Sequence, residues 1–308
     1  MAPHPIHEAN KNSPYGDLSR EGFYKKHQIL NKQSFIFNNK NLKIFTQSWQ
    51  PADSTSKLKG LVAMLHGYSA ESSWLFELNA VAMAREGYFV CALDLQGHGY
   101  SDGSPGIIPD FLSLVSDSIQ FFDSVRKEHP KLPAFLYGES LGGAISAIIC
   151  LRQKNEWNGL ILSGAMFSVW KDNLPQPVAL ELIKEGWKNK LTRKSPNFPT
   201  TPMMPIPKIT RQEFIKACIY IERRSHELEV PLLILHGGAD TVCDPQAAKF
   251  VFESAASKDK SMNIFPGMWH QLTGEPNESV ELVFEIMFSW IDVRAKIGKI
   301  TQKLASSL

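Results

Sequence analysis

The chain has 308 residues, 43% apolar and 21% charged, which is enough to bury the core of one large α/β domain or of one domain with an insertion. Its 33 basic and 31 acidic residues leave a formal net charge of +2 without a basic block or an aromatic-basic stripe, so a nucleic-acid partner is disfavoured. Four scattered cysteines (Cys91, Cys150, Cys218 and Cys243) and the lack of metal-ligand spacing predict no disulfide framework, no metal site and a reducing, cytoplasmic location.

The two ends of the chain carry no strong targeting signal. Residues 1–8 are polar and lack the apolar core of a signal peptide. No apolar run approaches the length of a membrane span, so we expect no integral membrane segment and at most a weak peripheral membrane contact. The C-terminal Ser306-Ser307-Leu308 resembles the peroxisomal Ser-Lys-Leu address but lacks its lysine, which favours a frayed tail.

The predicted elements begin after a polar stretch. Residues 1–30 are rich in Asn, His and Lys and are expected to form a loosely attached arm. Residues 35–37 and 42–45 are apolar and flank Asn38-Asn39, which predicts a β-hairpin.

Strands and helices are then predicted to alternate. Nearly continuous apolar runs typical of strands buried on both faces occur at Leu61–Leu65, Tyr88–Leu93, Ala134–Tyr137, Leu160–Leu162, Pro231–Leu235 and Met262–Phe265. Helical patterns lie at Trp74–Glu86, after the N-cap candidate Asp110, from Pro245 after Asp244, and at Ser279–Ile297. The pattern predicts an α/β fold with a mostly parallel, doubly wound central sheet flanked by helices.

One segment interrupts this alternation. It contains helix-like stretches at Val178–Leu191 and Arg211–Glu227, separated by five prolines between Pro196 and Pro207 that forbid a regular helix. We read it as a helical and proline-rich cap inserted over the carboxyl edge of the sheet, where open α/β sheets bind ligands. The predicted division is therefore an N-terminal arm (1–30), the first part of a core (31–163), a cap or lid (164–230) and the second part of the core (231–308).

The strongest chemical signal is Gly138-Glu139-Ser140-Leu141-Gly142, which stands between a predicted strand and a helix of small residues. In such a G-x-S-x-G turn the serine lies at the apex of a sharp bend, and the glycines let the helix and the strand pack closely. The alternative is an ordinary strand-helix turn with an incidental serine. The pattern favours Ser140 as a catalytic nucleophile.

A serine nucleophile needs a base and an acid, which follow it in the order serine, acid, histidine on sheets of this kind. Asp240 follows a buried strand on a glycine turn, and it is favoured over Asp244, whose place before Pro245 is explained by helix capping. His270 lies 270 − 240 = 30 positions after Asp240 and follows the last short strand. The alternative for His270 is a surface-loop histidine beside Trp269.

Two further histidines stand beside glycines at strand ends. His66 and His98 precede Ser140, which is the wrong side for this order, so we expect their ring nitrogens to tie down loops. A metal site formed by the pair is the minor alternative, because no third ligand is apparent. The oxyanion of an acyl transfer needs two backbone N–H donors, for which Leu141 and Tyr68 are the candidates.

With these residues in place, the chain resembles the monoacylglycerol lipase branch of the α/β-hydrolases, and within it the plant members that include caffeoylshikimate esterases. The resemblance rests on His66-Gly67-Tyr68, the run from Asp94 to Gly103, Tyr137 to Gly143, His236 to Asp240 with Asp244-Pro245, and Met268-Trp269-His270. It covers roughly residues 55–163 and 228–292. It implies an α/β-hydrolase fold, serine esterase chemistry with Ser140, Asp240 and His270 as the triad, and Tyr68 and Leu141 as oxyanion donors.

The departures from the family concern the substrate more than the chemistry. Leu141 stands where the family usually has methionine, which is a harmless change. The predicted cap is shorter and richer in proline than is usual there, which leaves the substrate open. Candidate pocket residues are Tyr68, Met166, Trp170, Trp187, Met203, Met204 and Trp269, although most apolar residues of the cap are expected to bind it to the core.

The sequence therefore predicts a cofactor-free serine hydrolase that cleaves small carboxylic esters, such as monoacylglycerols or hydroxycinnamoyl esters of the caffeoylshikimate type, through an acyl-enzyme on Ser140. Two alternatives stay open. The same triad can transfer the acyl group to another acceptor, as in an acyltransferase or an esterase of specialised metabolites. A non-catalytic small-molecule receptor on the same scaffold is less favoured, because the triad is complete. The oligomeric state is not predicted.

Overall fold

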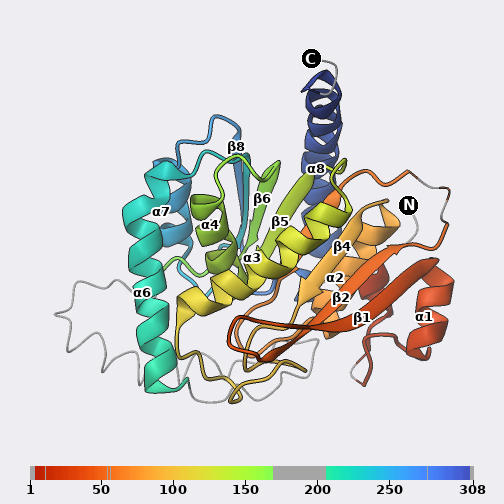
Figure 1. Cartoon of the computed structure of the whole chain (residues 1–308), viewed down its shortest axis with the longest axis horizontal. Helices are drawn as coiled ribbons and strands as arrows, with labels where there is room; N and C mark the ends of the chain where they lie inside the picture. Colours follow the sequence, from red (N-terminus) through yellow and green to blue (C-terminus); the bar gives the residue numbers. More distant parts are fainter. Residues whose placement is uncertain are drawn as a thin grey trace.

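An eight-stranded sheet forms the centre of the computed structural model, which describes residues 4–10, 12–53, 55, 57–168, 206–275 and 277–305, the side chains of 277 and 301–305 excepted. The strand order is β1-β2-β4-β3-β5-β6-β7-β8 (Figure 1). The strands are β1 (Ile29–Phe37), β2 (Lys43–Pro51), β3 (Leu61–Leu65), β4 (Phe89–Leu93), β5 (Ala134–Glu139), β6 (Gly159–Ser163), β7 (Leu232–Gly237) and β8 (Lys260–Phe265).

The sheet is mostly parallel. β1 pairs antiparallel with β2, which pairs antiparallel with β4, and all pairs from β4 to β8 are parallel. Residues in the parallel strands alternate between the two faces: Leu61 and Ala63 join the core on one side, and Val62 and Met64 join the core on the other. Burial on both faces explains why these strands are continuously apolar in sequence.

Helices cover both faces of the sheet. The helices are α1 (Arg20–His27), α2 (Trp74–Arg85), α3 (Phe111–Glu128), α4 (Leu141–Arg152), α6 (Lys208–Arg224), α7 (Pro245–Ser254) and α8 (Asn277–Ala305), with short 3₁₀ turns at η1 (Pro5–Glu8), η2 (Ser225–Glu227) and η3 (Leu272–Gly274). Side chains of α3, α4, α6 and α7 form one core, and those of α1, α2 and α8 form the other. Figure 1 shows helices on both faces of the sheet. None of the helices in the described ranges is both long and apolar enough to cross a membrane.

The predicted α/β fold with a mostly parallel sheet is confirmed. The helix starts follow the local chemistry that the sequence indicated. The Asp110 side chain caps α3 by accepting a hydrogen bond from Leu112 N (3.1 Å), and Asp244 caps α7 by accepting one from Gln246 N (2.8 Å). Pro245 occupies the first turn of α7, where its missing N–H costs nothing.

The predicted cap lies largely outside the described residues. Val178–Leu191 and four of the five prolines belong to residues 169–205, so the division into arm, core and cap stays a prediction. The described part of the segment includes α6, which packs against α3 and α4.

The expectation of a loosely attached arm is wrong for the described residues of the N-terminal segment. Phe23 is fully buried, and Ile6 is 4% exposed; both lie in the core formed by α2 and α8. Arg20 of α1 forms an ion pair with Glu77 of α2, with 2.9 Å between Arg20 Nη2 and Glu77 Oε1. The Glu77 side chain is fully buried. The segment is held because these few apolar and charged side chains find partners far along the chain, which a reading of local composition does not register.

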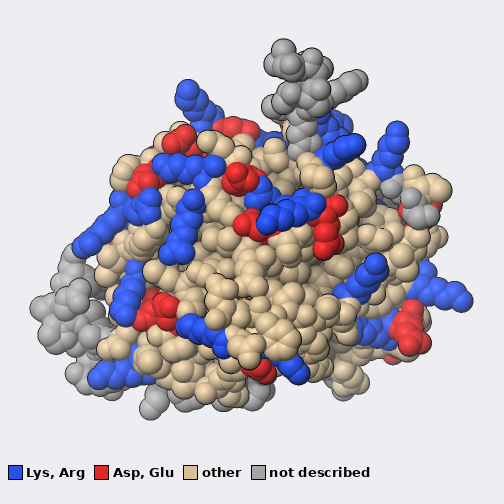
Figure 2. Space-filling view, viewed as in Figure 1, with Lys and Arg blue, Asp and Glu red and all other residues tan. Residues whose placement is uncertain are grey.

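The charged side chains do not gather into a single-sign patch on the face seen in Figure 2. Lysine and arginine side chains there are interspersed with aspartate and glutamate around a broad uncharged area. This distribution accords with the near-neutral balance of charges in the sequence.

Candidate active site

Ser140 lies at the apex of the turn between β5 and α4. Its backbone has φ 51° and ψ −115°, a conformation that a serine adopts only when the surrounding structure imposes it, at about 1–3 kcal/mol. Ser140 N donates to Ser163 O (3.1 Å) and Met166 N donates to Ser140 O (3.0 Å), so β6 and the turn after it hold the strained residue. The bend leaves Ser140 partly exposed at the carboxyl edge of the sheet.

Gly142 explains how close the helix comes to the sheet. A Cβ atom at this position would lie 2.1 Å from Leu65 O, which is closer than atoms can approach. Only glycine therefore allows α4 to start directly against the end of β3. The same close packing brings the loop after β3 to the serine, because a Cβ on Gly67 would lie 3.3 Å from Ser140 Cβ.

Asp240, in the loop after β7, is held by three hydrogen bonds and a close contact with His236. Its Oδ1 accepts from Val242 N (2.8 Å) and Cys243 N (3.0 Å). Its Oδ2 accepts from His270 Nδ1 (2.8 Å) and lies 3.1 Å from His236 Nε2. Burial alone would raise the pKa of Asp240, but the donors from His236, His270 and the backbone outweigh it and hold this pKa well below its usual value. The carboxylate is therefore charged throughout the neutral range.

His270 follows β8 and is oriented by Asp240. Because Nδ1 donates to the carboxylate, Nε2 is the nitrogen left to accept a proton. The ring packs against the turn after β6, where a Cβ on Gly164 would lie 3.3 Å from His270 Nδ1. The next residues of this turn reach Ser140 through the Met166 N–H, so the serine and the histidine flank the same turn.

The structure therefore brings two of the three predicted residues into direct contact. Asp240 and His270 are hydrogen-bonded, whereas Ser140 and His270 form no hydrogen bond with each other in this structure. Bonds of this kind are often long before a substrate is bound and shorten in the reacting complex.

The two predicted oxyanion donors lie on either side of Ser140. Leu141 is the first residue of α4, where the first N–H groups of a helix have no partner inside the helix. Tyr68 lies in the loop of residues 66–73, here called the oxyanion loop, which follows β3 and contacts Ser140 through Gly67. Within the described part of the chain, neither N–H has a hydrogen-bond acceptor. The Tyr68 hydroxyl donates to Gly106 O (2.7 Å), which anchors its ring.

His66 and His98 act as loop ties. His66 Nδ1 bonds Gly67 O (2.8 Å) and its Nε2 accepts from Leu95 N (3.0 Å), which joins the loops after β3 and β4. His98 Nδ1 bonds Gln96 O (3.1 Å). Burial lowers the pKa of each ring to about 4, so both are neutral at physiological pH.

Because both rings are buried in the neutral form, we expect the free energy of unfolding to fall in acid. A histidine whose pKa falls from 6.5 to about 4 on folding contributes no penalty above pH 6.5 and costs up to about 3 kcal/mol once the pH reaches 4, because only the unfolded chain takes up the proton. We expect the advantage of the parent over His98→Gln in free energy of unfolding to shrink by about that amount between pH 7 and pH 4. Urea unfolding followed by circular dichroism measures it; a difference that does not vary with pH would contradict the neutral, buried ring.

His236 lies at the candidate site, although its sequence motif indicated no role for it. It is fully buried at the end of β7, and its Nε2 bonds Cys243 O (3.1 Å) and lies 3.1 Å from Asp240 Oδ2. The signal is its spacing, since His236 stands four residues before the acid across a glycine turn. Glu139, which directly precedes Ser140, is another residue to which the sequence pattern gave no role. Burial raises its pKa, opposed by hydrogen bonds from Tyr137 and Asn79 and by the charge of His270.

The candidate pocket residues are only partly described. Tyr68 lies in the oxyanion loop. Trp269 is partly exposed, and its backbone N–H donates to Glu275 Oε1 (2.6 Å). Met166 is buried in the core with 4% exposure. Trp170, Trp187, Met203 and Met204 lie outside the described residues.

Comparison with known proteins gives consistent matches. Residues 56–277 match the family model Hydrolase_4, described as serine aminopeptidase, S33. Caffeoylshikimate esterase of Arabidopsis thaliana is 33% identical over 310 residues, covering 92% of this chain and 91% of that protein. Human monoglyceride lipase is 29% identical and covers 82% of this chain and 87% of its own length.

Solved structures share the fold. A soluble variant of monoglyceride lipase from Saccharomyces cerevisiae, in complex with a substrate analogue, superposes with a TM-score of 0.67 at 21% identity, covering 85% of this chain and 94% of that one. A thermostable carboxyl esterase from Bacillus coagulans, in complex with glycerol, gives a TM-score of 0.68 at 18% identity, covering 86% and 99%. At these identities the likeness concerns the fold alone.

Proposed function

The chain belongs to the Hydrolase_4 family (serine aminopeptidase, S33) and is a carboxylic-ester hydrolase, and from this premise we propose that it cleaves monoacylglycerols or hydroxycinnamoyl esters through an acyl-enzyme on Ser140. The observation that carries the proposal is the 2.8 Å bond between Asp240 and His270, formed at the same sheet edge as the strained serine. An acid that orients a histidine at the same sheet edge as a partly exposed serine fits the arrangement that nucleophilic acyl transfer requires.

In the proposed first step, Ser140 Oγ attacks the ester carbonyl carbon while His270 Nε2 takes the hydroxyl proton. The carbonyl oxygen gains the negative charge, and the N–H groups of Tyr68 and Leu141 stabilise it. The C–O bond to the alcohol then breaks, the alcohol leaves with the proton from His270, and the acyl group stays on Ser140. Asp240 keeps Nδ1 protonated and stabilises the imidazolium that forms.

The second step repeats this chemistry with water. His270 takes a proton from a water molecule, whose oxygen attacks the acyl carbon, and the proton then returns to Ser140 Oγ as the acid leaves. His236 supports both steps, because its bond to Asp240 helps to keep the acid charged while His270 is charged. Each proton taken up is released again, so the enzyme returns to its starting state.

The two substrate classes are supported by the relatives. The relative that is 33% identical is named for caffeoylshikimate, and those at 26–29% identity are named for monoglycerides. A cytoplasmic location is proposed on the sequence, because its four cysteines are scattered without the spacing of a disulfide framework.

A substrate panel tests the proposal. Monoacylglycerols of graded chain length and caffeoylshikimate are assayed with the parent protein, together with an alcohol acceptor at rising concentration. We expect free acid as the product, and a kcat/KM for one class that exceeds the other by at least about tenfold, the discrimination that pocket contacts of about 1.4 kcal/mol supply. Turnover of neither class would refute the substrate assignment, and acyl transfer to the acceptor in place of acid release would refute hydrolysis as the reaction.

A further inference from the structure

We propose that Ser72 is a positioning residue for the oxyanion loop, clamped from opposite sides by Asp94 and Gln47. The inference rests on the proposed function, because this loop carries the Tyr68 N–H assigned there to the oxyanion. Ser72 itself does not reach the reacting atoms; it acts through the backbone that joins it to Tyr68.

The oxyanion loop is strained and therefore depends on external contacts. Ser69 has φ 56°, and Trp74, the residue directly after the loop, has φ 49°. Residues other than glycine avoid these φ values. Each such residue costs about 1–3 kcal/mol, and it persists only where contacts with the surrounding structure hold it. Between them stands Ser72, which is 1% exposed, so the anchoring point is inside the protein.

Asp94, in the loop after β4, binds Ser72 through two hydrogen bonds. Asp94 Oδ1 accepts from both Ser72 N (2.7 Å) and Ser72 Oγ (2.6 Å), while Oδ2 accepts from Tyr100 N (2.9 Å). The carboxylate is 1% exposed, so these bonds are shielded from water. Gly99 makes the approach possible, because a Cβ there would lie 2.1 Å from Asp94 Oδ2.

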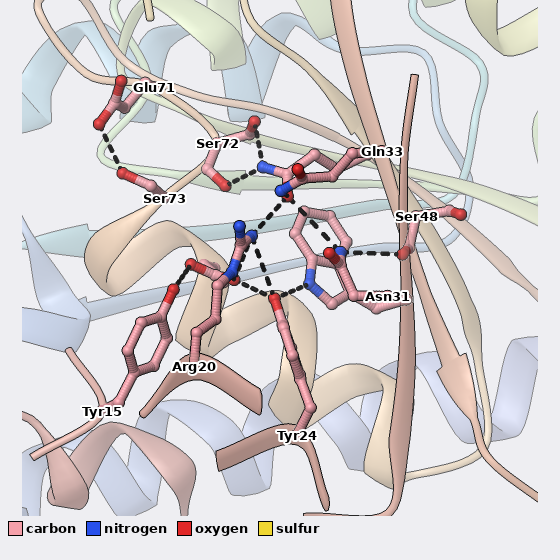
Figure 3. A network of polar contacts seen from close by, with 12 residues as sticks. Tyr15, Arg20, Tyr24, Asn31, Gln33, Ser48, Glu71, Ser72 and Ser73 are labelled. Carbon is pink, nitrogen blue, oxygen red and sulfur yellow. Dashed lines mark hydrogen bonds and ion pairs between the residues drawn. The ribbon is translucent and has the colours of Figure 1, made fainter. Parts of the chain in front are cut away.

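Gln47 of β2 holds the other side of Ser72. Its Nε2 donates to Ser72 O and to Ser72 Oγ, both at 2.8 Å, so the hydroxyl accepts from Gln47 while it donates to Asp94. Gln47 Oε1 accepts in turn from Arg20 of α1 (2.9 Å). Figure 3 shows Arg20, Tyr24 and Ser72 within one network of polar contacts. The N-terminal segment thus supports the clamp from outside the sheet.

The neighbouring Ser73 provides the contrast. Its hydroxyl donates to Glu71 Oε1 (2.6 Å), both residues are partly exposed, and its side chain does not cap α2 (Figure 3). Ser72 and Ser73 therefore carry the same chemical group on the same loop, but only Ser72 links the loop to two buried side chains.

The experiment compares Ser72→Ala with Ser73→Ala on a p-nitrophenyl ester, with kcat expressed per active site as titrated by a fluorophosphonate. We expect Ser72→Ala to lower kcat and kcat/KM by the same factor, about 10- to 100-fold, because the oxyanion contact is made only in the transition state and its complete loss typically costs about 100- to 1000-fold. Ser73→Ala is expected to stay within about twofold of the parent.

A second variant avoids dependence on one substitution. Gln47→Glu keeps an oxygen for Arg20 but replaces the Nε2 donor with an oxygen facing Ser72 O, so the same equal loss in kcat and kcat/KM is expected. A merely structural role would lower the number of titratable sites or the unfolding temperature and leave kcat per titrated site unchanged. That result for both variants would overturn the inference.

The outcomes also separate the inference from the function on which it rests. If the fluorophosphonate does not label Ser140 in the folded parent, the proposed function fails and the positioning role fails with it. If the parent is labelled and active but Ser72→Ala and Gln47→Glu match Ser73→Ala per titrated site, only the positioning role is wrong.

Discussion

Replacing Ser140 with alanine is expected to lower kcat/KM for ester hydrolysis by about 10⁴- to 10⁶-fold, because the substitution removes the oxygen that we propose forms the acyl-enzyme. The fold should survive, since alanine keeps the Cβ and the main-chain bonds to Ser163 and Met166 do not involve the side chain. We expect the unfolding temperature to change by a few degrees at most. Release of p-nitrophenol measures the rate, and loss of fluorophosphonate labelling identifies the nucleophile.

Ser146 offers a matched control for this variant. It lies on α4, the helix that begins directly after Ser140, is fully buried, and its hydroxyl has no hydrogen-bond partner in the described structure. Ser146→Ala removes the same kind of atom six residues further along and is expected to retain full activity, because no paired group is left behind. Equal activity of Ser140→Ala and Ser146→Ala would contradict the role of Ser140.

Replacing Asp240 with asparagine is expected to lower kcat by about 10³- to 10⁴-fold while binding changes little. Asp240 Oδ1 accepts from Val242 N and Cys243 N, so an asparagine keeps its oxygen there and places its NH2 group, a donor, toward His270 Nδ1. The amide therefore favours the other tautomer of His270, and without a charge it does not stabilise the imidazolium. Steady-state kinetics against the same ester measures the loss.

Asp244→Asn is the control for that prediction, since Asp244 is the other acid in the loop and caps α7 by accepting from Gln246 N (2.8 Å). Asparagine caps helices as well as aspartate, so both stability and activity should be retained. A large loss in Asp244→Asn together with an active Asp240→Asn would reassign the acid of the triad.

Most of the sheet could be predicted from the sequence because burial on both faces imposes a continuous apolar run on each parallel strand. Leu61–Leu65 and Leu232–Gly237 are fully buried along their whole length, and their sequences have no other simple explanation. The turn at Ser140 could be predicted as well. Gly142 must be glycine because a Cβ there would collide with Leu65 O, and a requirement of this kind fixes the position of the glycine relative to Ser140 in the sequence.

What could not be predicted depends on partners that are distant in sequence. Arg20 and Glu77 look like solvated charges in their own segments, yet their pairing across 77 − 20 = 57 positions fastens the N-terminal segment to α2. The hydrogen bonds from Gln47 to Ser72 could not be predicted for the same reason. No residue near Gln47 in the sequence indicates that its amide faces the loop after β3. Buried polar pairs carry no periodicity, so only the assembled structure reveals them.

The last position of β8 in both the chain and the sheet has a consequence for biosynthesis. Among the described strands β8 pairs only with β7, and the loop that carries His270 follows it, so the proposed triad cannot be assembled until the chain has been synthesised well beyond His270. Under the proposed function, a nascent chain that already displays Ser140 but not His270 is therefore expected to be inactive.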